Sequence, residues 1–193
     1  MIKSLVRNFA RELSVRKLYN FLLSANVSLS KTKVYEYFSY LQDINFVFVL
    51  RKYGKGVREV EGSIPKIYLT DIGFVTLYGV DDRGRRIENV VAIELLRKKN
   101  YLKPLLEVYY WKDTSGKEVD FVLTDRMEVK QLIQVCYDID DILTKERELK
   151  SLVKASKELG CSDLLVITWD YEDEQVFKNK NIRYVPLWKW LLE

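Results

Sequence analysis

The stretch Glu118-Val119-Asp120-Phe121-Val122 reads as a strand, and after a turn it is followed by Leu132-Ile133-Gln134-Val135-Cys136. Side chains alternate between the two faces of a sheet, so Asp120 and Gln134 can project on the same side when these strands pair. Cys136 lies two residues beyond Gln134 and shares that face. The pair therefore predicts a sheet that gathers a few polar side chains on an otherwise apolar surface.

The sequence around this pair alternates between helical and strand patterns, which is typical of an α/β arrangement. Residues 86–98 carry apolar side chains around most of a helical circumference, so we expect a largely buried helix there. A second helix is expected from Thr144 to Gly160. Strands are expected at residues 108–111, 118–123, 131–136, 164–168 and 182–185, with a closing helical turn at 186–192. This order predicts a mixed sheet flanked by helices.

The first half reads as helices followed by two strands. Ser14 and Ser30 are placed to cap two helices. The second helix carries Val34, Tyr37, Phe38 and Leu41 at helical spacing. Strand formers at 46–50 and 65–70 flank a polar excursion, residues 51–63, that contains three glycines. Two helices joined by a tight turn and followed by such a hairpin predict a winged helix-turn-helix.

Composition divides the chain at the polar run 81–86, which predicts a domain of residues 1–80 and another of residues 81–193. The net charge of +4 is uneven, because residues 1–80 hold 12 Lys and Arg against 6 Asp and Glu. A basic first half indicates contact with nucleic acid there, although ordinary surface charge explains an excess of this size equally well.

Six basic residues are candidates for DNA contact because they lie on the expected recognition helix or on the tip of the expected wing. They are Lys31, Lys33, Arg51, Lys52, Lys55 and Arg58. Their positive electrostatic potential is weakened by nearby carboxylates, those of Glu36, Glu59 and Glu61. A winged helix that serves as a protein-docking platform is the alternative, since a fold does not determine a function.

The composition excludes several kinds of chemistry. Histidine is absent, which removes Ser-His and Cys-His nucleophiles and the usual zinc sites. Cys136 and Cys161 have no metal-like spacing, and no apolar run approaches a membrane span, so we expect a cytoplasmic protein without a membrane partner. Abundant Lys, Arg, Glu, Tyr and Ile indicate a thermophile.

Phosphodiester hydrolysis needs a divalent cation, oxygen ligands for it and an activated water. Asp120 is the first candidate ligand, Glu88 on the buried helix can add a second carboxylate, and Gln134 can supply an amide oxygen. Glu118 lies on the same strand face as Asp120. The alternative is structural: Asp120 accepts backbone N–H groups at a sheet end, and Gln134 is a satisfied core amide.

The chain resembles the C-terminal region of archaeal AAA-type ATPases, in which a winged helix precedes a restriction-endonuclease-like, PD-(D/E)XK domain. The matching stretches are Lys66-Ile67-Tyr68-Leu69-Thr70-Asp71-Ile72-Gly73, Ile87-Glu88-Asn89-Val90-Val91, Tyr109-Tyr110-Trp111, Gly116-Lys117-Glu118-Val119-Asp120-Phe121-Val122, Leu132-Ile133-Gln134-Val135, Thr144-Lys145-Glu146-Arg147-Glu148 and Pro186-Leu187-Trp188-Lys189-Trp190-Leu191. The resemblance implies a nuclease-like fold that normally follows an ATPase module.

Carried over by position, Glu88 is the helix glutamate of that superfamily and Asp120 its central aspartate. Gln134 stands where the second acid is expected, and Cys136 stands where a water-positioning lysine is expected. The resemblance implies catalysis and Mg²⁺ or Mn²⁺ binding by Glu88, Asp120 and Gln134, but two of the four usual positions are altered. A neutral thiol does not replace an ammonium.

A lysine from elsewhere could take the vacant role, and sequence proximity makes Lys130, Lys150 and Lys154 the candidates. Without one, we expect a degenerate site in a DNA-associated module. An active Mg²⁺- or Mn²⁺-dependent nuclease and a protein-docking module for a separate ATPase are the alternatives.

The chain has no G-x-x-x-x-G-K-[ST] loop, so we do not expect it to hydrolyse ATP by itself. The sequence leaves open a stand-alone protein or a fragment of a larger ATPase, and also a homo-oligomer.

Overall fold

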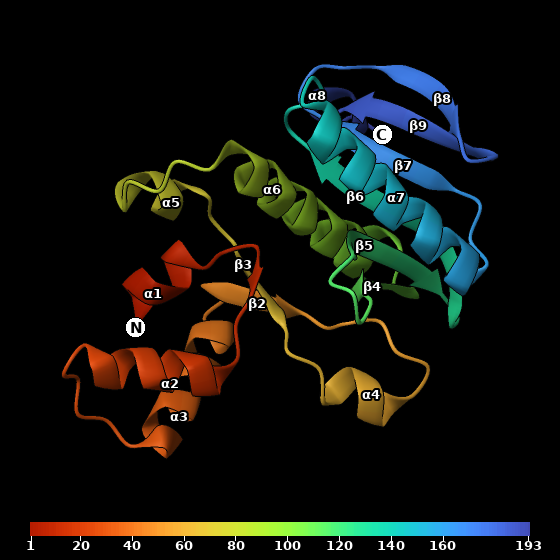
Figure 1. The fold of residues 1–193 in the computed structure, drawn as a ribbon. Helices are drawn as coiled ribbons and strands as arrows, with labels where there is room; N and C mark the ends of the chain where they lie inside the picture. The colour runs from red at the N-terminus through yellow and green to blue at the C-terminus, as the bar shows by residue number, and fades with distance from the viewer.

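A computed structural model describes residues 1–193, with the side chain of Ile142 outside the description. Figure 1 shows the first half of the chain beside a larger sheet that carries helices. The elements of the first half are α1 (Ile2–Arg7), β1 (Arg11–Glu12), α2 (Val15–Ser24), α3 (Lys31–Asp43), β2 (Val47–Leu50), α4 (Val57–Glu61), β3 (Lys66–Leu69) and α5 (Gly73–Leu77).

The expected helix starts of the first half are confirmed. The Ser14 side chain accepts the Lys17 N–H at the start of α2, and Ser30 accepts the Lys33 N–H at the start of α3. Both helices bury an apolar stripe, which includes Leu18 and Leu22 of α2 and Val34 and Phe38 of α3. Tyr37, expected on that stripe, is instead exposed.

A small antiparallel sheet follows these helices in the order β1-β3-β2. Val49 of β2 pairs with Ile67 of β3, and Arg11 of β1 pairs with Ile67 from the other side. The excursion between β2 and β3, expected as a plain hairpin tip, contains the short helix α4. β3 is therefore a central strand with neighbours on both edges, and its four side chains are buried.

The second half builds the larger sheet. Its elements are α6 (Arg83–Arg97), the π-helical turn η1 (Lys98–Leu102), β4 (Leu106–Lys112), β5 (Glu118–Asp125), β6 (Glu128–Cys136), α7 (Ile142–Leu159), β7 (Leu164–Thr168), β8 (Asp173–Phe177), β9 (Lys180–Pro186) and α8 (Leu187–Trp190). The strand order is β4-β5-β6-β7-β9-β8. β6, β7 and β9 are mutually parallel, whereas the remaining pairs are antiparallel.

The expected mixed sheet flanked by helices is confirmed, because α6 and α7 bury apolar residues against the sheet in two separate clusters. One cluster joins α7 to one face of the sheet, with Val122, Leu132 and Leu152 among its members. The other contains Val91 of α6 and Phe121 of β5, and it continues into the first half. No helix in the described residues is long and apolar enough to cross a membrane.

Two local expectations were wrong. Helix α6, expected to begin at residue 86, begins at Arg83 inside the polar run 81–86, where the Asp82 carboxylate accepts the Arg85 N–H at 3.0 Å. Strand β8 was missed because it is an edge strand whose sequence, Asp173-Glu174-Gln175-Val176-Phe177, is mostly polar and mostly exposed.

Candidate functional site

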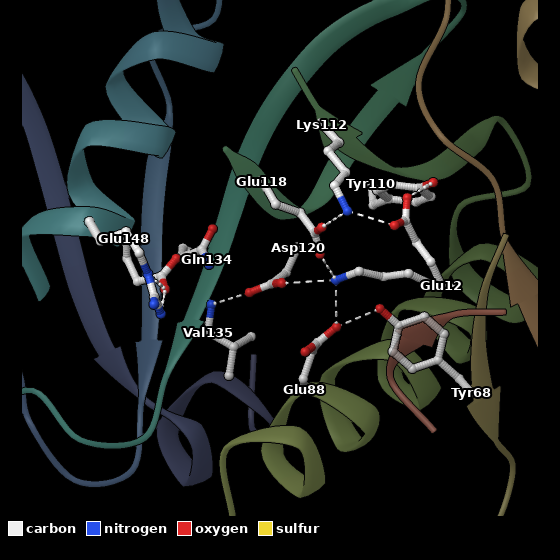
Figure 2. A network of polar contacts seen from close by, with 12 residues as sticks. Glu12, Tyr68, Glu88, Tyr110, Lys112, Glu118, Asp120, Gln134, Val135 and Glu148 are labelled. Atoms are coloured by element: carbon white, nitrogen blue, oxygen red, sulfur yellow. Dashed lines mark hydrogen bonds and ion pairs between the residues drawn. The ribbon is translucent and has the colours of Figure 1, made fainter. Parts of the chain in front are cut away.

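The buried ammonium of Lys66 lies among three carboxylates. Its Nζ is 2.6 Å from Glu118 Oε1, 2.9 Å from Glu88 Oε1 and 3.1 Å from Asp120 Oδ1. The Lys66 side chain is 3% exposed. Figure 2 shows the carboxylates of Glu88, Glu118 and Asp120 converging on the same point. A buried charge needs this kind of compensation, because an isolated ion in the interior is strongly destabilising.

Three elements bring these groups together. Lys66 begins β3, where its backbone pairs with Glu12 of β1 and Leu50 of β2, so its side chain starts from a fixed point. Glu88 lies in α6, which packs against β3: the Asn89 amide bonds both the N–H and the C=O of Leu69, at 2.9 and 2.7 Å. The carboxylates of Glu118 and Asp120, at the start of β5, complete the cluster.

Outer hydrogen bonds fix each carboxylate. The Tyr68 hydroxyl donates to Glu88 Oε1 at 2.7 Å, and the Val135 N–H donates to Asp120 Oδ2 at 3.0 Å. Figure 2 shows a second ammonium, that of Lys112, between Glu118 and Glu12. Its Nζ lies 3.2 Å from Glu118 Oε2 and 2.6 Å from Glu12 Oε2. The network thus ties the first half of the chain to the start of β5.

Burial and charge determine the protonation of the cluster. Burial, reinforced by the Asp120 charge, raises the pKa of Glu88 to about 7, and burial also raises the pKa of Asp120. Burial alone would lower the pKa of Lys66, but the surrounding carboxylates, Glu88 foremost, raise it well above its usual value. Burial opposes ionisation of Glu118 as well, yet Lys66 and Lys112 lower its pKa. Lys66 is therefore the charged cation of the site.

Gln134 faces the same cleft but belongs to a different set of contacts. Its Nε2 donates to Glu148 Oε2 at 2.7 Å, and Arg147 pairs with Glu148 at 2.7 Å. The Gln134 side chain is buried, and its Oε1 has no hydrogen-bond partner in the described part of the chain. A cleft of about 490 Å³ contains all three predicted site residues: it is lined by Glu88, Glu118, Asp120, Gln134 and Glu148, among others.

Cys136 does not join the cleft. It packs in the apolar cluster beneath α7, and its Sγ donates to the Asp138 carbonyl at 3.2 Å. Burial raises the pKa of its thiol to about 11, so the thiol is neutral near pH 7 and cannot act as an ammonium.

The lysines that sequence proximity favoured are also elsewhere, and that expectation was wrong. Lys130 pairs with Glu128, Lys150 with Glu146, and Lys154 with Asp113. Lys66 is the lysine whose ammonium contacts Glu88 and Asp120. The sequence did contain a clue to Lys66: it is the one charged residue of an otherwise apolar strand. Tyr68, two residues later, lies on the same face of that strand.

The oxygens predicted to bind Mg²⁺ or Mn²⁺ already bind an ammonium. Glu88 Oε1 and Asp120 Oδ1 both contact Lys66, whereas Gln134 presents one unpaired amide oxygen. Among the described residues, no group of three or more Asp, Glu, Cys or His side chains is placed to hold a metal ion. The donor set as arranged does not fit a divalent cation, because the Lys66 ammonium occupies the point where the carboxylate oxygens converge, and a cation would need those oxygens at about 2.0–2.6 Å.

The predicted DNA-contacting residues differ in their surroundings. Lys31, Lys33, Lys55 and Arg58 are exposed, and Lys33 pairs with Glu36 at 2.6 Å. Lys52 and Arg51 are half-buried, and Arg51 donates to the carbonyl of Ser63 at 3.2 Å and pairs with Glu61 at 3.6 Å. Arg51 thus holds the excursion between β2 and β3 in place, and the four exposed residues form the accessible basic set.

Comparison with known proteins gives a family and a longer relative. Residues 83–190 match the family described as "Domain of unknown function (DUF4143)". The uncharacterized protein MJ1544 of Methanocaldococcus jannaschii is 32% identical over 195 residues. That match covers 97% of this chain and 42% of the relative, so the chain spans less than half of the relative's length. No solved structure matches.

Proposed function

This chain belongs to the family of the domain of unknown function DUF4143, and we propose that it is a DNA-associated module whose nuclease-like domain does not cleave. The observation that carries the proposal is the Lys66 ammonium within 3.1 Å of Glu88, Glu118 and Asp120. In a metal-dependent nuclease, acidic side chains at this point hold the cation that activates water. Here a covalently attached ammonium occupies the point where they converge, and it cannot carry a water nucleophile.

Two further features support loss of cleavage. Gln134 replaces a carboxylate with a neutral amide, which binds hard cations more weakly. The neutral Cys136 thiol does not line the cleft and carries no positive charge, so it cannot stabilise charge that develops on a phosphate.

Association with DNA is supported by the first half of the chain. Helices α2 and α3, followed by β2 and β3, have the order of a winged helix, and Figure 1 shows α3 away from the six-stranded sheet. The exposed residues Lys31 and Lys33 begin α3, and Lys55 and Arg58 project from the excursion. These positions fit phosphate contacts on either side of a helix in the major groove.

Salt-dependent binding tests the proposal. Fluorescence anisotropy with labelled duplex and branched DNA should give an affinity that falls steeply with salt, because phosphate contacts release counterions. The double variant K31A/K33A should bind less tightly with a shallower salt slope, whereas K130A, which changes an exposed lysine on β6, should match the parent.

The same DNA incubated with Mn²⁺ should stay intact. Absence of salt-sensitive binding would refute DNA association, and chelator-sensitive cleavage would refute the degenerate site.

One observation favours a second function, docking to an ATPase module as the family resemblance implies. Helix α3 exposes Tyr35 (49%), Tyr37 (39%) and Tyr40 (57%), with Ile44 (71% exposed) at its end. Tyrosines that are free of the core are typical of protein interfaces. The test is binding of this chain to the separately expressed remainder of the longer archaeal relative, measured with the parent and with Y40A. Binding that Y40A weakens, without salt-sensitive DNA binding, would favour docking over DNA contact.

A further inference from the structure

A second pocket lies beyond the carboxyl ends of the parallel strands, at the same end of β6 as the acidic cleft, and it shares no lining residue with that cleft. Strands β6, β7 and β9 run parallel and end level with one another, with Cys136 beside Thr168 and Thr168 beside Pro186. Figure 1 shows the start of α6 near these strand ends. In open α/β sheets, ligands bind outside the carboxyl ends of the parallel strands. This pocket, of about 410 Å³, falls in the size range of small-ligand sites.

The pocket has an aromatic wall. Tyr137 directly follows β6 and Trp169 directly follows β7, and their ring centroids are 6.1 Å apart at an interplanar angle of 52°. Trp169 is 54% exposed although the indole is the largest apolar side chain, so much of its surface is accessible to a ligand. Ile87 of α6 completes the apolar lining.

Two arginines complete the pocket, and its lining contains no carboxylate. The Arg83 guanidinium lies 5.7 Å from the centre of the Tyr137 ring and donates to the Tyr137 hydroxyl at 2.6 Å. Arg86 donates to the Val80 carbonyl at 2.8 Å, and its Nε is buried without a partner. In the described part of the chain neither arginine forms an ion pair, whereas their neighbour Arg85 pairs with Asp82 at 2.6 Å.

Nearby acids do not occupy these guanidinium groups. Asp138 and Asp170 follow the two aromatic residues in the sequence, and Asp138 Oδ1 closes its own turn by accepting the Asp140 N–H at 3.1 Å. The pocket therefore combines an exposed π-surface with two guanidinium groups that form no ion pair in the described part of the chain. A flat aromatic ligand that carries a negative group matches both features.

We propose that the pocket lined by Arg83, Arg86, Tyr137 and Trp169 binds a nucleobase that carries a phosphate. The base stacks on Trp169, and the phosphate pairs with Arg83. The ligand comes either from a single strand of nucleic acid or from a free nucleotide, since both present this chemistry. The site is separate from the duplex contact proposed for α3, so either can fail without the other.

Binding assays with two kinds of probe test the proposal on the full chain. One is a labelled single-stranded oligonucleotide followed by anisotropy, and the other is AMP or ATP followed by calorimetry. At least one should bind. W169A should lower the affinity about tenfold or more, because stacking of one base supplies that much, whereas W169F should retain most of it. R83Q should weaken binding and should reduce the slope of log affinity against log salt by about 1, as expected for the loss of one phosphate contact.

Control variants separate this site from the α3 surface. K31A/K33A should bind the single-strand or nucleotide probe as the parent does, and W169A should bind duplex DNA as the parent does. Trp169 and Arg83 are both exposed, so these variants should fold, which circular dichroism can verify. The proposal is overturned if neither probe binds, if W169A binds as tightly as the parent, or if R83Q leaves both affinity and salt slope unchanged.

Discussion

Lys66 determines how the acidic residues of the cleft behave. Its buried Nζ contacts oxygens of Glu88, Glu118 and Asp120. Attraction in such a site is strong, but so is the cost of removing each charge from water. A network of this kind is stable only when complete, so the loss of one member should cost more than the loss of an exposed ion pair.

Substitution of Lys66 tests this completeness. K66M keeps most of the apolar stem but leaves three carboxylates without their shared cation, so we expect a loss of about 3–5 kcal/mol in the free energy of unfolding. K112M, which removes a partly exposed ammonium from the same network, should cost about 1 kcal/mol or less. Urea unfolding of both variants measures the difference, and equal effects would contradict the central role of Lys66.

K66M should also gain a response to metal ions. Ca²⁺ binds oxygens at about 2.3–2.6 Å, a little shorter than the 2.6–3.1 Å between Lys66 Nζ and its three partners. Added Ca²⁺ or Mn²⁺ should therefore raise the melting temperature of K66M and leave that of the parent unchanged. The double variant K66M/D120N is the control, because it lacks one of the oxygens. A parent that responds as strongly as K66M would show that the ammonium does not block the site.

Glu88 should give the molecule a measurable pH dependence. Its ordinary pKa of 4.5 rises to about 7 in the folded chain, chiefly through burial. Folding thus takes up a proton between these values, so the stability that Glu88 contributes is complete below pH 4.5 and is lost as the pH rises through 7. E88Q mimics the protonated form and should reduce this loss. Urea midpoints between about pH 5 and pH 8 measure it.

The control for the Glu88 prediction is E118Q. The pKa of Glu118 is lowered by Lys66 and Lys112 despite burial, so Glu118 stays ionised above pH 4.5 in both the folded and the unfolded chain. E118Q should therefore shift the urea midpoint by the same amount at every pH in this window. Parallel pH profiles for the parent and E88Q would contradict the assignment of the titration to Glu88.

Sequence patterns located the acidic residues of the cleft but not their partners. Alternation along two strands placed Asp120 and Gln134 on one face, and the apolar pattern of the preceding helix singled out Glu88 as a second carboxylate; all three line the cleft. The Lys66 contact joins residues 54 positions apart, through the packing of β3 against α6. No local sequence pattern predicts a contact between residues so far apart. Proximity along the chain instead favoured Lys130, Lys150 and Lys154, which form ion pairs elsewhere.

At the scale of elements, the ends of α7 show what local sequence determines. The helix was expected to end at Gly160, and it does, with Gly160 as C-cap at φ 69°. Its start was expected at Thr144 but lies at Ile142, because Asp141 accepts the N–H groups of Leu143 and Thr144. Both caps depend on residues within one turn of the helix end, so each is a local signal in the sequence. Edge strand β8 owes its pairing to β9 and could not be read in the same way.

A glycine pair tests the C-cap of α7. Gly160 is left-handed, and a Cβ built on it would meet nothing within 4 Å, so G160A should act through backbone conformation alone. We expect a loss of about 1 kcal/mol. Gly56, the N-cap of α4, has equally open space but φ −141°, which any residue adopts, so G56A should change stability by less than about 0.5 kcal/mol. Equal urea midpoints for the two variants would contradict this account.

At the scale of the whole molecule, the two halves share one interior. A single buried cluster extends from Leu5 in α1 to Trp190 in α8 and includes residues of β3, α6 and the larger sheet. Asn89 supplies both hydrogen bonds to Leu69 across the same junction, and Lys66 crosses it to reach Asp120. The composition of the chain changes near residue 81 because a polar, solvent-facing run lies there. Composition says little about which apolar faces of the two halves pack together.

Separation of the chain at that boundary should therefore destabilise its second half. A fragment of residues 81–193 keeps the whole larger sheet but loses Lys66 and Tyr68, so the carboxylates of Glu88 and Asp120 lose their cation and the apolar side of α6 faces water. We expect the fragment to bind a hydrophobic dye and to unfold at lower urea with a broader transition than the full chain. Residues 1–80 added as a separate peptide should restore dye exclusion, whereas the same peptide with K66M should do so poorly. A fragment that unfolds as sharply as the full chain and at the same midpoint would show that the two halves are independent domains.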